Sequence, residues 1–428
     1  MRFLTAAIAA LSLVPGLPVR ASGPSPAGSV LTLDAAFDRT IAAHPDLRVF
    51  EPRRAALVAE RERAAQRPAW TAGAELENAF GSGDARGLHS AELTLTLAGV
   101  LERGGKQAAR EALAQRRIDA LGVEREARRL DLLAETARRY LAIVAARQNG
   151  EIARQDIEQR TRAVTAARRR LDAGASPESV LLTAESALAR AELDRDRAAQ
   201  RFDAARQHLA ALWDETDARF EPADHATPAL PAIAGAAALA RLLEQTPELA
   251  QFADERRVRE ARLQLARSEA KPNIDVSFGL RRRESDDDFG LVGAISVPLG
   301  ARGRARPGIR AAEAELTALD IEREARIASL RSTLAEAHGR YGVARLEATR
   351  YVEDILPKLA KAEAAAERSY RAGAISYLEW AQVQSEHTAA RRQRLDAEQE
   401  AQRALIELQR LTAEPFVPGT SPNPEAQP

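Results

Sequence analysis

The chain has 428 residues with 62 basic and 62 acidic side chains, so no overall basic field points to nucleic acid as a partner. Aromatic residues make up 4% and charged residues 29% of the chain, a mixture typical of long helices and coiled coils and poor material for a compact core. The sequence contains no cysteine, so we expect neither disulfides nor a lipidated N-terminal cysteine.

Residues 1–21 have the pattern of a secretory signal peptide. Arg2 provides the positive start, residues 3–13 the apolar segment, and Val19-Arg20-Ala21 a small-residue cleavage site. We therefore expect export with cleavage near Ala21/Ser22; the alternative is a short buried helix. No later apolar run reaches the roughly 18 residues of a transmembrane helix.

The first half of the mature chain, 31–213, is predicted to be mainly helical with one strand hairpin. In "SAELTLTLAGV" apolar and polar residues alternate, which is the period of a strand with one apolar face. In chain order we expect a helix of about thirty residues ending at Pro68, strands at 70–80 and 90–100, a helix from Gly104 to Asp172, a break at 173–177, and a returning helix of about 35 residues.

The second half, 235–412, repeats this order at an offset of 199 to 204 residues, which predicts two tandem repeats. A linker, 214–234, separates the repeats, and a proline-rich tail, 413–428, follows them. The expected elements are a helix ending at Pro272, strands at 273–283 and 289–299, a helix from Arg304 to Ala372, a break at 372–376, and a returning helix.

The two breaks are predicted to be the tips of helical hairpins. Gly174 and Gly373 can adopt the left-handed conformation that ends a helix. Ser176 with Pro177, and Ser376, are expected to cap the helices that follow.

Four strands cannot close a membrane barrel, for which about eight is the minimum. Several chains would have to contribute, and three chains would give twelve strands. The alternative is two soluble hairpins packed on the helices. The helices have an alanine-rich stripe and broad polar faces, which fits a wall of helices around water, although an ordinary solvated coiled coil remains open.

Three features together resemble the TolC-like outer-membrane efflux protein family. They are "LTLDAAFDRTIAAHPDL", the doubled helix–strand–strand–helix order, and the tips "RLDAGASPESVLLTAESALARAEL" and "YRAGAISYLEWAQVQSEHTAAR". The resemblance covers essentially the whole mature length. It implies a mainly α fold with a small β part, in which a homotrimer forms a twelve-stranded outer-membrane β-barrel and a long periplasmic α-helical barrel. It also implies docking to a periplasmic adaptor (membrane fusion) protein attached to an inner-membrane RND pump, and contact with outer-membrane lipid.

The segment "LAGVLERGGKQAAREALA" resembles the CzcC-like branch, which serves heavy-metal cation pumps. The matching residues are Glu102, Gly104, Gly105 and Lys106, together with Ser-Pro after the first tip glycine. The segment "VPLGARGRARPGI" is looser than that branch's pattern, and the lipidated cysteine of many relatives is absent. The expected function is a passive conduit for heavy-metal cations. The alternatives are a channel for drug or solvent efflux or type I secretion, and, from another class, a periplasmic adaptor or coiled-coil scaffold.

The resemblance implies roles for residues at the two tips. Glu379, six positions past the second tip glycine, would narrow the closed channel mouth, and Gln382 stands where some relatives have a second acid. The residues expected to form the adaptor-docking surface are Arg170, Gly174, Ala175, Ser176, Tyr370, Gly373, Ala374 and Ser376.

Glu75, Glu77, Glu92 and Asp275 fall on the polar side of the predicted strands, where a channel lumen would place them; the alternative is an exposed sheet face. We expect no enzyme, because "LERGGKQ" lacks the phosphate-loop glycine and serine or threonine. The six histidines show no metal-ligand spacing, so neither a metal site nor a cofactor is expected.

Overall fold

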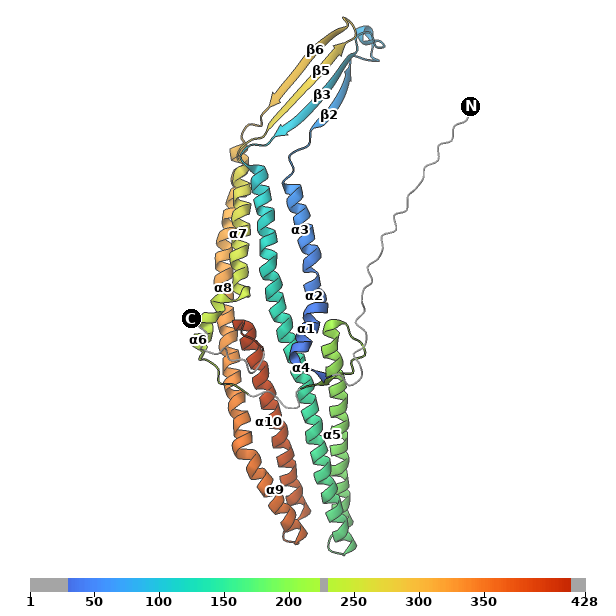
Figure 1. The fold of residues 1–428 in the computed structure, drawn as a ribbon, viewed down its shortest axis with the longest axis vertical. Coiled ribbons are helices and arrows are strands. Elements are labelled where there is room, and N and C mark those ends of the chain that lie inside the picture. The colour runs from blue at the N-terminus through green and yellow to red at the C-terminus, as the bar shows by residue number, and fades with distance from the viewer. Residues whose placement is uncertain (1–29, 224–229, 417–428) are drawn as a thin grey trace, which may run out of the picture.

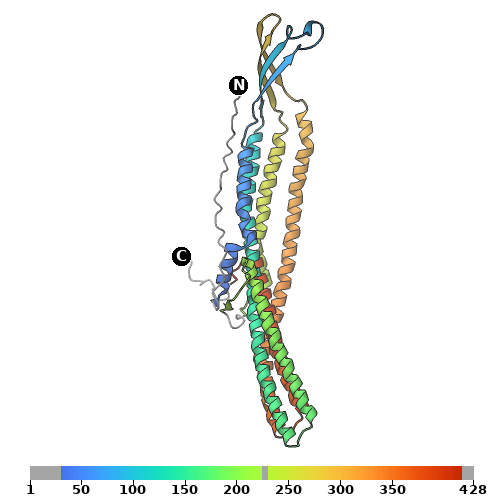
Figure 2. The same cartoon turned by 90° about the vertical axis from the view of Figure 1, so that its right-hand side faces the viewer.

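The computed structural model describes residues 30–223 and 230–416. The molecule is elongated, with a small sheet at one end, long helices through the middle and two helical hairpins at the other end (Figures 1 and 2). The predicted signal peptide and most of the predicted tail lie outside the described residues.

Both halves of the chain contribute the same kinds of element. The first half contains α1 (Leu33–Ala43), α2 (Pro45–Arg48), α3 (Phe50–Ala64), β2 (Thr71–Glu77), β3 (Glu92–Leu101), α4 (Lys106–Asp172) and α5 (Glu178–Ala210). The second half contains α6 (Ala236–Leu242), α7 (Pro247–Ser268), β5 (Ile274–Arg283), β6 (Asp288–Ser296), α8 (Ala301–Arg350), a π-helical turn (Tyr351–Ile355), α9 (Leu356–Arg371) and α10 (Tyr377–Thr412). A two-residue parallel bridge pairs β1 (Val30–Leu31) with β4 (Glu221–Pro222).

The four long strands form one antiparallel sheet in the order β2-β3-β5-β6. The central pair, β3 and β5, joins the two halves of the chain, with Glu92 opposite Arg283 and Leu101 opposite Ile274. Strand β2 is shorter than the segment 70–80 expected from the sequence. Asn78 and Phe80 have φ of 53° and 58°, which the extended conformation does not allow.

The long helix α4 has 67 residues and so spans roughly 100 Å. The expectation of an unbroken second long helix from Arg304 to Ala372 is wrong. That helix begins earlier, at Ala301, and is interrupted by the π-helical turn before it continues as α9. In each half a left-handed glycine precedes the long helix and another stands at the tip: Gly105 and Gly174 in the first half, Gly300 and Gly373 in the second. The second pair is four residues further apart than the first, and the π-helical turn accommodates part of this excess.

The helix expected before each hairpin is also not continuous. In the first half it is divided into α1, α2 and α3 at His44 and Val49, and it ends at Ala64, ahead of Pro68. Pro45 explains the first division, because a proline disfavours helical geometry in the residue before it. In the second half a 3-10 turn, Leu243–Gln245, separates α6 from α7.

The core is a set of separate seams along the helices, in keeping with the elongated shape. Two buried tyrosines, 201 residues apart, have matching roles in the two halves. Tyr140 donates to the carbonyl of Leu31 at 3.1 Å, and Tyr341 donates to the carbonyl of Pro231 at 2.5 Å. Each bond fastens a long helix to the segment that crosses it near the middle of the molecule. Among the described residues, no helix carries an apolar stretch long enough to cross a membrane.

Candidate functional site

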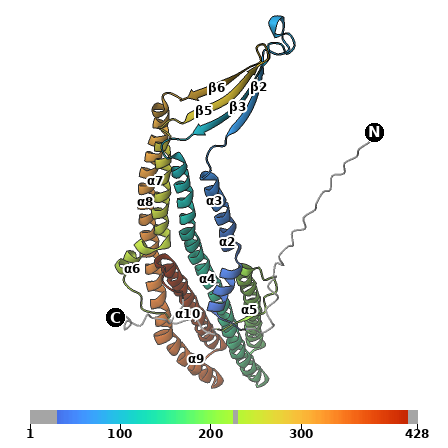
Figure 3. The same cartoon turned by 45° about the horizontal axis from the view of Figure 1, so that its top comes forward.

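The two hairpin tips lie side by side at the end of the molecule opposite the sheet (Figures 1 and 3). Gly174 and Gly373 are left-handed, with φ of 69° and 81°, as predicted. At the first tip the amides of Gly174 and Ala175 donate to the carbonyls of Leu171 and Arg170, both at 2.8 Å. The second tip has the same pair of bonds, so both helices end in a Schellman motif that requires the left-handed residue.

The serines differ between the tips. Ser376 caps α10: its Oγ accepts from the amide of Glu379 at 3.3 Å, and Glu379 Oε2 accepts from the Ser376 amide at 2.7 Å. The expectation that Ser176 caps the other helix is wrong, because α5 starts one residue later behind Pro177 and has no side-chain cap. The bond from the Ser376 backbone, followed by the bond from its hydroxyl, lowers the pKa of Glu379 below its usual range. Glu379 is therefore a fixed negative charge at the tip, with Gln382 exposed less than one helical turn further on.

Arg170 connects the two hairpins. Its Nη1 donates to the carbonyl of Tyr370 at 2.8 Å, and its guanidinium lies 5.1 Å from the centre of the Tyr370 ring. The Tyr370 side chain is 2% exposed, so in the single chain it lies inside the tip and not on its surface. The exposed residues of the tips include the small residues Gly174, Ala175, Gly373 and Ala374.

Beneath this surface lies an aromatic cluster that the sequence analysis missed. Tyr370 stacks on Trp380 with ring centres 5.0 Å apart, and Tyr377 contacts both rings edge-on. Trp380 is fully buried. The spacing of Tyr377 and Trp380 at i and i+3 on one helix was the available signal, since such residues share a face.

A buried polar layer follows the aromatic cluster along the same seam, between α4, α9 and α10. Glu363 accepts from Gln159 at 3.2 Å and lies 2.5 Å from Nδ1 of His387. Asp156 accepts from Arg160 at 3.2 Å and from the hydroxyl of Thr388 at 3.0 Å. Charged residues in a helix seam have to be paired in this way, because unpaired burial is costly.

At the other end of the molecule, the strand register places Glu75, Glu77, Glu92 and Asp275 on one face of the sheet. Arg281, which the sequence analysis did not single out, lies on this face. It donates to Glu77 at 3.1 Å, to Glu92 at 2.9 Å and to the hydroxyl of Thr94 at 3.0 Å. Only the pairing of β3 with β5 brings these groups together, since Arg281 is 189 residues from Glu92.

The opposite face of the sheet is apolar and exposed. Its large side chains are between 43% and 91% exposed, as for Leu93 and Leu291. They also include Leu76, Leu95, Leu97, Phe278, Leu280, Phe289 and Ile295. A surface of this kind marks an interaction with lipid or with another protein.

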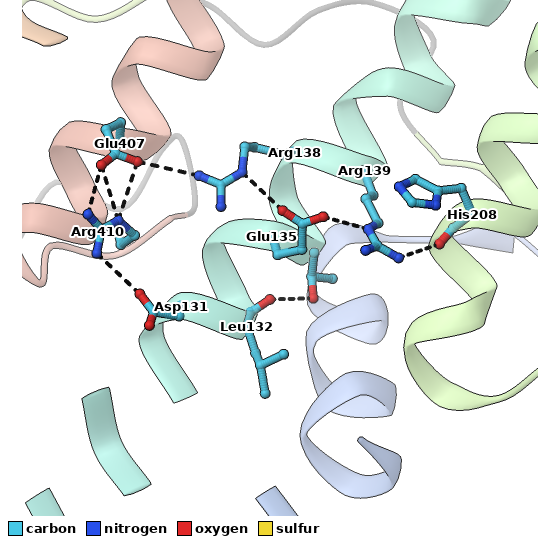
Figure 4. A network of polar contacts seen from close by, with 9 residues as sticks. Asp131, Leu132, Glu135, Arg138, Arg139, His208, Glu407 and Arg410 are labelled. Atoms are coloured by element: carbon cyan, nitrogen blue, oxygen red, sulfur yellow. Dashed lines mark hydrogen bonds and ion pairs between the residues drawn. The ribbon is translucent and has the colours of Figure 1, made fainter. Parts of the chain in front are cut away.

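A charged network in the middle of the molecule joins the two repeats (Figure 4). Glu407 on α10 accepts from Arg410 at 2.8 Å and from Arg138 on α4 at 3.4 Å. Glu135 accepts from Arg139 at 2.7 Å, and Arg139 donates onward to the carbonyl of His208 on α5 at 2.7 Å. Burial alone would raise the pKa of Glu135 and of Glu407, but hydrogen bonds and charges of the arginines outweigh it and lower both.

Within the residues that the structure describes, no three His, Asp or Glu side chains are grouped so as to hold a metal ion. Glu77, Glu92, Glu135 and Glu407 are instead paired with arginine, and Glu379 is bound to the backbone of Ser376.

The model of the outer membrane efflux protein family matches residues 37–215 and 238–414. The chain belongs to this family. The two matched stretches each contain one strand hairpin and one helical hairpin of the fold described above.

Among curated proteins, the chain is similar to the cobalt-zinc-cadmium resistance protein CzcC of Cupriavidus metallidurans, at 28% identity over 280 residues, covering 65% of this chain and 67% of CzcC. Among solved structures, it superposes on CusC with a TM-score of 0.72 at 17% identity, covering 91% of this chain and 95% of that one. It superposes on the outer membrane protein VceC of Vibrio cholerae with a TM-score of 0.71 at 17% identity, covering 90% and 97%. These likenesses confirm the expected fold, a mainly helical outer-membrane efflux protein with four strands per chain.

Proposed function

We propose that the chain is the outer-membrane channel subunit of a tripartite, RND-type efflux system, and that it conducts heavy-metal cations passively from the periplasm to the exterior. The observation that carries the proposal is the two-faced sheet. Its apolar face is exposed, its opposite face carries charged side chains, and each of its edge strands, β2 and β6, pairs with a described strand on one side only.

An open sheet edge in a membrane leaves backbone groups unsatisfied, which costs several kcal/mol per group. Four strands cannot satisfy both edges by closing on themselves. Three copies of the chain would pair β6 of one with β2 of the next and close twelve strands into one barrel. The apolar face would then contact lipid, and Glu75, Glu77, Glu92 and Asp275 would face the lumen.

The small residues of the tips support adaptor docking. Gly174, Ala175, Gly373 and Ala374 are exposed and allow close approach of a partner's helical hairpin. In this proposal Arg170 and Tyr370 hold the two tips in register from inside, and the hydroxyl of Ser376 is already used as a cap. Glu379 would lie at the periplasmic mouth, where three like charges attract cations.

The assignment to metal cations rests on the likeness to the cobalt-zinc-cadmium resistance protein and on the acidic residues of the sheet and tip. A conduit needs no tight metal site, because tight binding would slow release. The rival is a channel for drug or solvent efflux or type I secretion, which the same fold could serve.

The test is deletion of the gene, followed by growth in Co, Zn, Cd, Ni, Cu and Ag salts and in a panel of lipophilic drugs. Metal sensitivity that the wild-type gene reverses would support the proposal. Drug sensitivity with unchanged metal tolerance would exclude the cation assignment. Complementation with Glu379→Ala tests the mouth, and Glu386→Ala, an exposed acid on the same helix, is the matched control.

A further inference from the structure

Exposed basic side chains gather where the sheet joins the long helices. In segments 66–71, 101–107, 269–275 and 298–310 there are eight basic and three acidic residues, although the chain as a whole is neutral. Seven of the eight are exposed and make no ion pair with any described residue, and one of the seven, Arg304, donates to the carbonyl of Leu299 at 2.9 Å. We call the other six the basic collar: Arg67, Arg103, Lys271, Arg302, Arg306 and Arg310.

The lack of partners distinguishes the collar from the rest of the sheet. At the far end of the same strands, Arg281, Arg282 and Arg283 all have carboxylate partners, at distances from 2.9 to 3.6 Å. A positive charge that is paired internally contributes little to binding an external anion. The collar therefore retains its charge for a ligand, while the far end does not.

Three collar residues form a line along one helix. Arg302, Arg306 and Arg310 are four residues apart in the first three turns of α8, so they share a face and follow one another at about 6 Å. The headgroup layer on each side of a bilayer is about 5–8 Å thick. Arg302 and Arg306 would fall within it, and the long side chain of Arg310 can reach it.

Apolar residues border the collar on the side of the sheet. Trp70, just before β2, is 55% exposed, Leu101 at the end of β3 is 49% exposed, and Leu299 beside α8 is 87% exposed. Tryptophan is enriched at the membrane–water boundary, because its ring is apolar and its N–H remains solvated. A tryptophan and two exposed leucines thus lie between the apolar face of the sheet and the basic collar.

We propose that the basic collar binds the anionic phosphate headgroups of the membrane leaflet nearest the helices and so fixes how deeply the channel is inserted. The inference rests on the proposed function, since it requires the sheet to lie in the outer membrane. The occupant is a lipid surface because the unpaired charges adjoin a continuous exposed apolar face, which a soluble anion would leave uncovered.

The experiment uses the full-length protein purified in neutral detergent and mixed with micelles that contain phosphatidylglycerol and phosphatidylcholine in equal amounts. Gel filtration then separates the protein, and the bound lipids are counted by headgroup. The variant is Arg302→Gln/Arg306→Gln/Arg310→Gln. The matched control is Arg162→Gln/Arg190→Gln/Arg331→Gln, which removes three exposed arginines far from the sheet.

We expect wild type and control to retain phosphatidylglycerol over phosphatidylcholine by about fivefold or more at low salt, because each arginine near an anionic surface contributes roughly that factor. The variant should show a much weaker preference than the wild type, carried by the remaining Arg67, Arg103 and Lys271, and 0.5 M NaCl should abolish the preference of the wild type. An equal preference in variant and wild type, or no preference in the wild type, would overturn the proposal.

Loss of oligomers in the variant with its lipid preference unchanged would also overturn it, because the arginines would then pair with carboxylates of a neighbouring copy. Insertion into phosphatidylcholine vesicles is measured in parallel. If no protein inserts, the proposed function is wrong. If the protein inserts but shows no headgroup preference, only the proposal that the basic collar binds lipid is wrong.

Discussion

Replacement of Glu407 by glutamine should weaken the junction between the two repeats. The change keeps the size of the side chain and removes the charge that Arg410 and Arg138 share. Removing one partner of a fully buried ion pair costs about 3–5 kcal/mol, and an exposed pair is worth about 0–1 kcal/mol. The three side chains are 20–35% exposed, and Arg410 keeps Asp131 at 3.2 Å, so we expect a loss of about 1–2 kcal/mol.

The pH dependence of this loss tests its cause. The native pKa of Glu407 lies below its ordinary value of 4.5, so its charge stabilises the native state at neutral pH. This contribution is complete above about pH 5 and disappears as the pH falls through the native pKa. Glutamine does not titrate. The difference in free energy of unfolding between wild type and Glu407→Gln should therefore become smaller toward pH 3.

The assay is urea unfolding followed by circular dichroism in detergent, at pH 7 and at pH 3.5, with Glu386→Gln as a control on the same helix. Glu386 is exposed and makes no ion pair with any described residue, so its replacement should change the free energy of unfolding by less than about 0.5 kcal/mol. A gap for Glu407→Gln that is absent at pH 7, or equally large at both pH values, would refute the reasoning.

Three further changes follow from the tips and the sheet. Ser376→Ala should destabilise the start of α10 by about 1 kcal/mol, and Ser176→Ala by almost nothing, because only Ser376 makes a cap; hydrogen exchange of the tip amides compares the two. Gly373→Ala should destabilise the protein by about 1–2 kcal/mol, because residue 373 has a left-handed backbone. Gly342→Ala should stabilise it, because Gly342 lies inside α8 with open space around it. Equal melting temperatures of the two variants would contradict this. Arg281→Gln leaves Glu77 and Glu92 without their arginine partner. Reversal potentials in planar bilayers at low salt should therefore show a higher selectivity for cations. An unchanged reversal potential would place this face of the sheet outside the conducting path.

Much of the fold could be predicted because its signals are local. The two-residue alternation identified the strand hairpins, the repeat offset predicted two equivalent halves, and Gly174 and Gly373 marked the hairpin tips. Each of these depends on the backbone preferences of a few neighbouring residues. Where local signals competed, the predictions failed. The serine of the first tip precedes Pro177, which itself occupies the N-cap position, so the same residue type caps one helix and not the other.

The tertiary structure alone decided which distant groups meet. Arg281 is bound by Glu77 and Glu92 only because β3 pairs with β5, and the network around Glu407 exists only because α10 packs on α4. No spacing along the chain encodes such contacts. The sequence by itself determined the elements and their repetition, since these follow from local geometry. The location of paired and unpaired charge followed from packing, which brings residues about 200 positions apart within hydrogen-bonding distance.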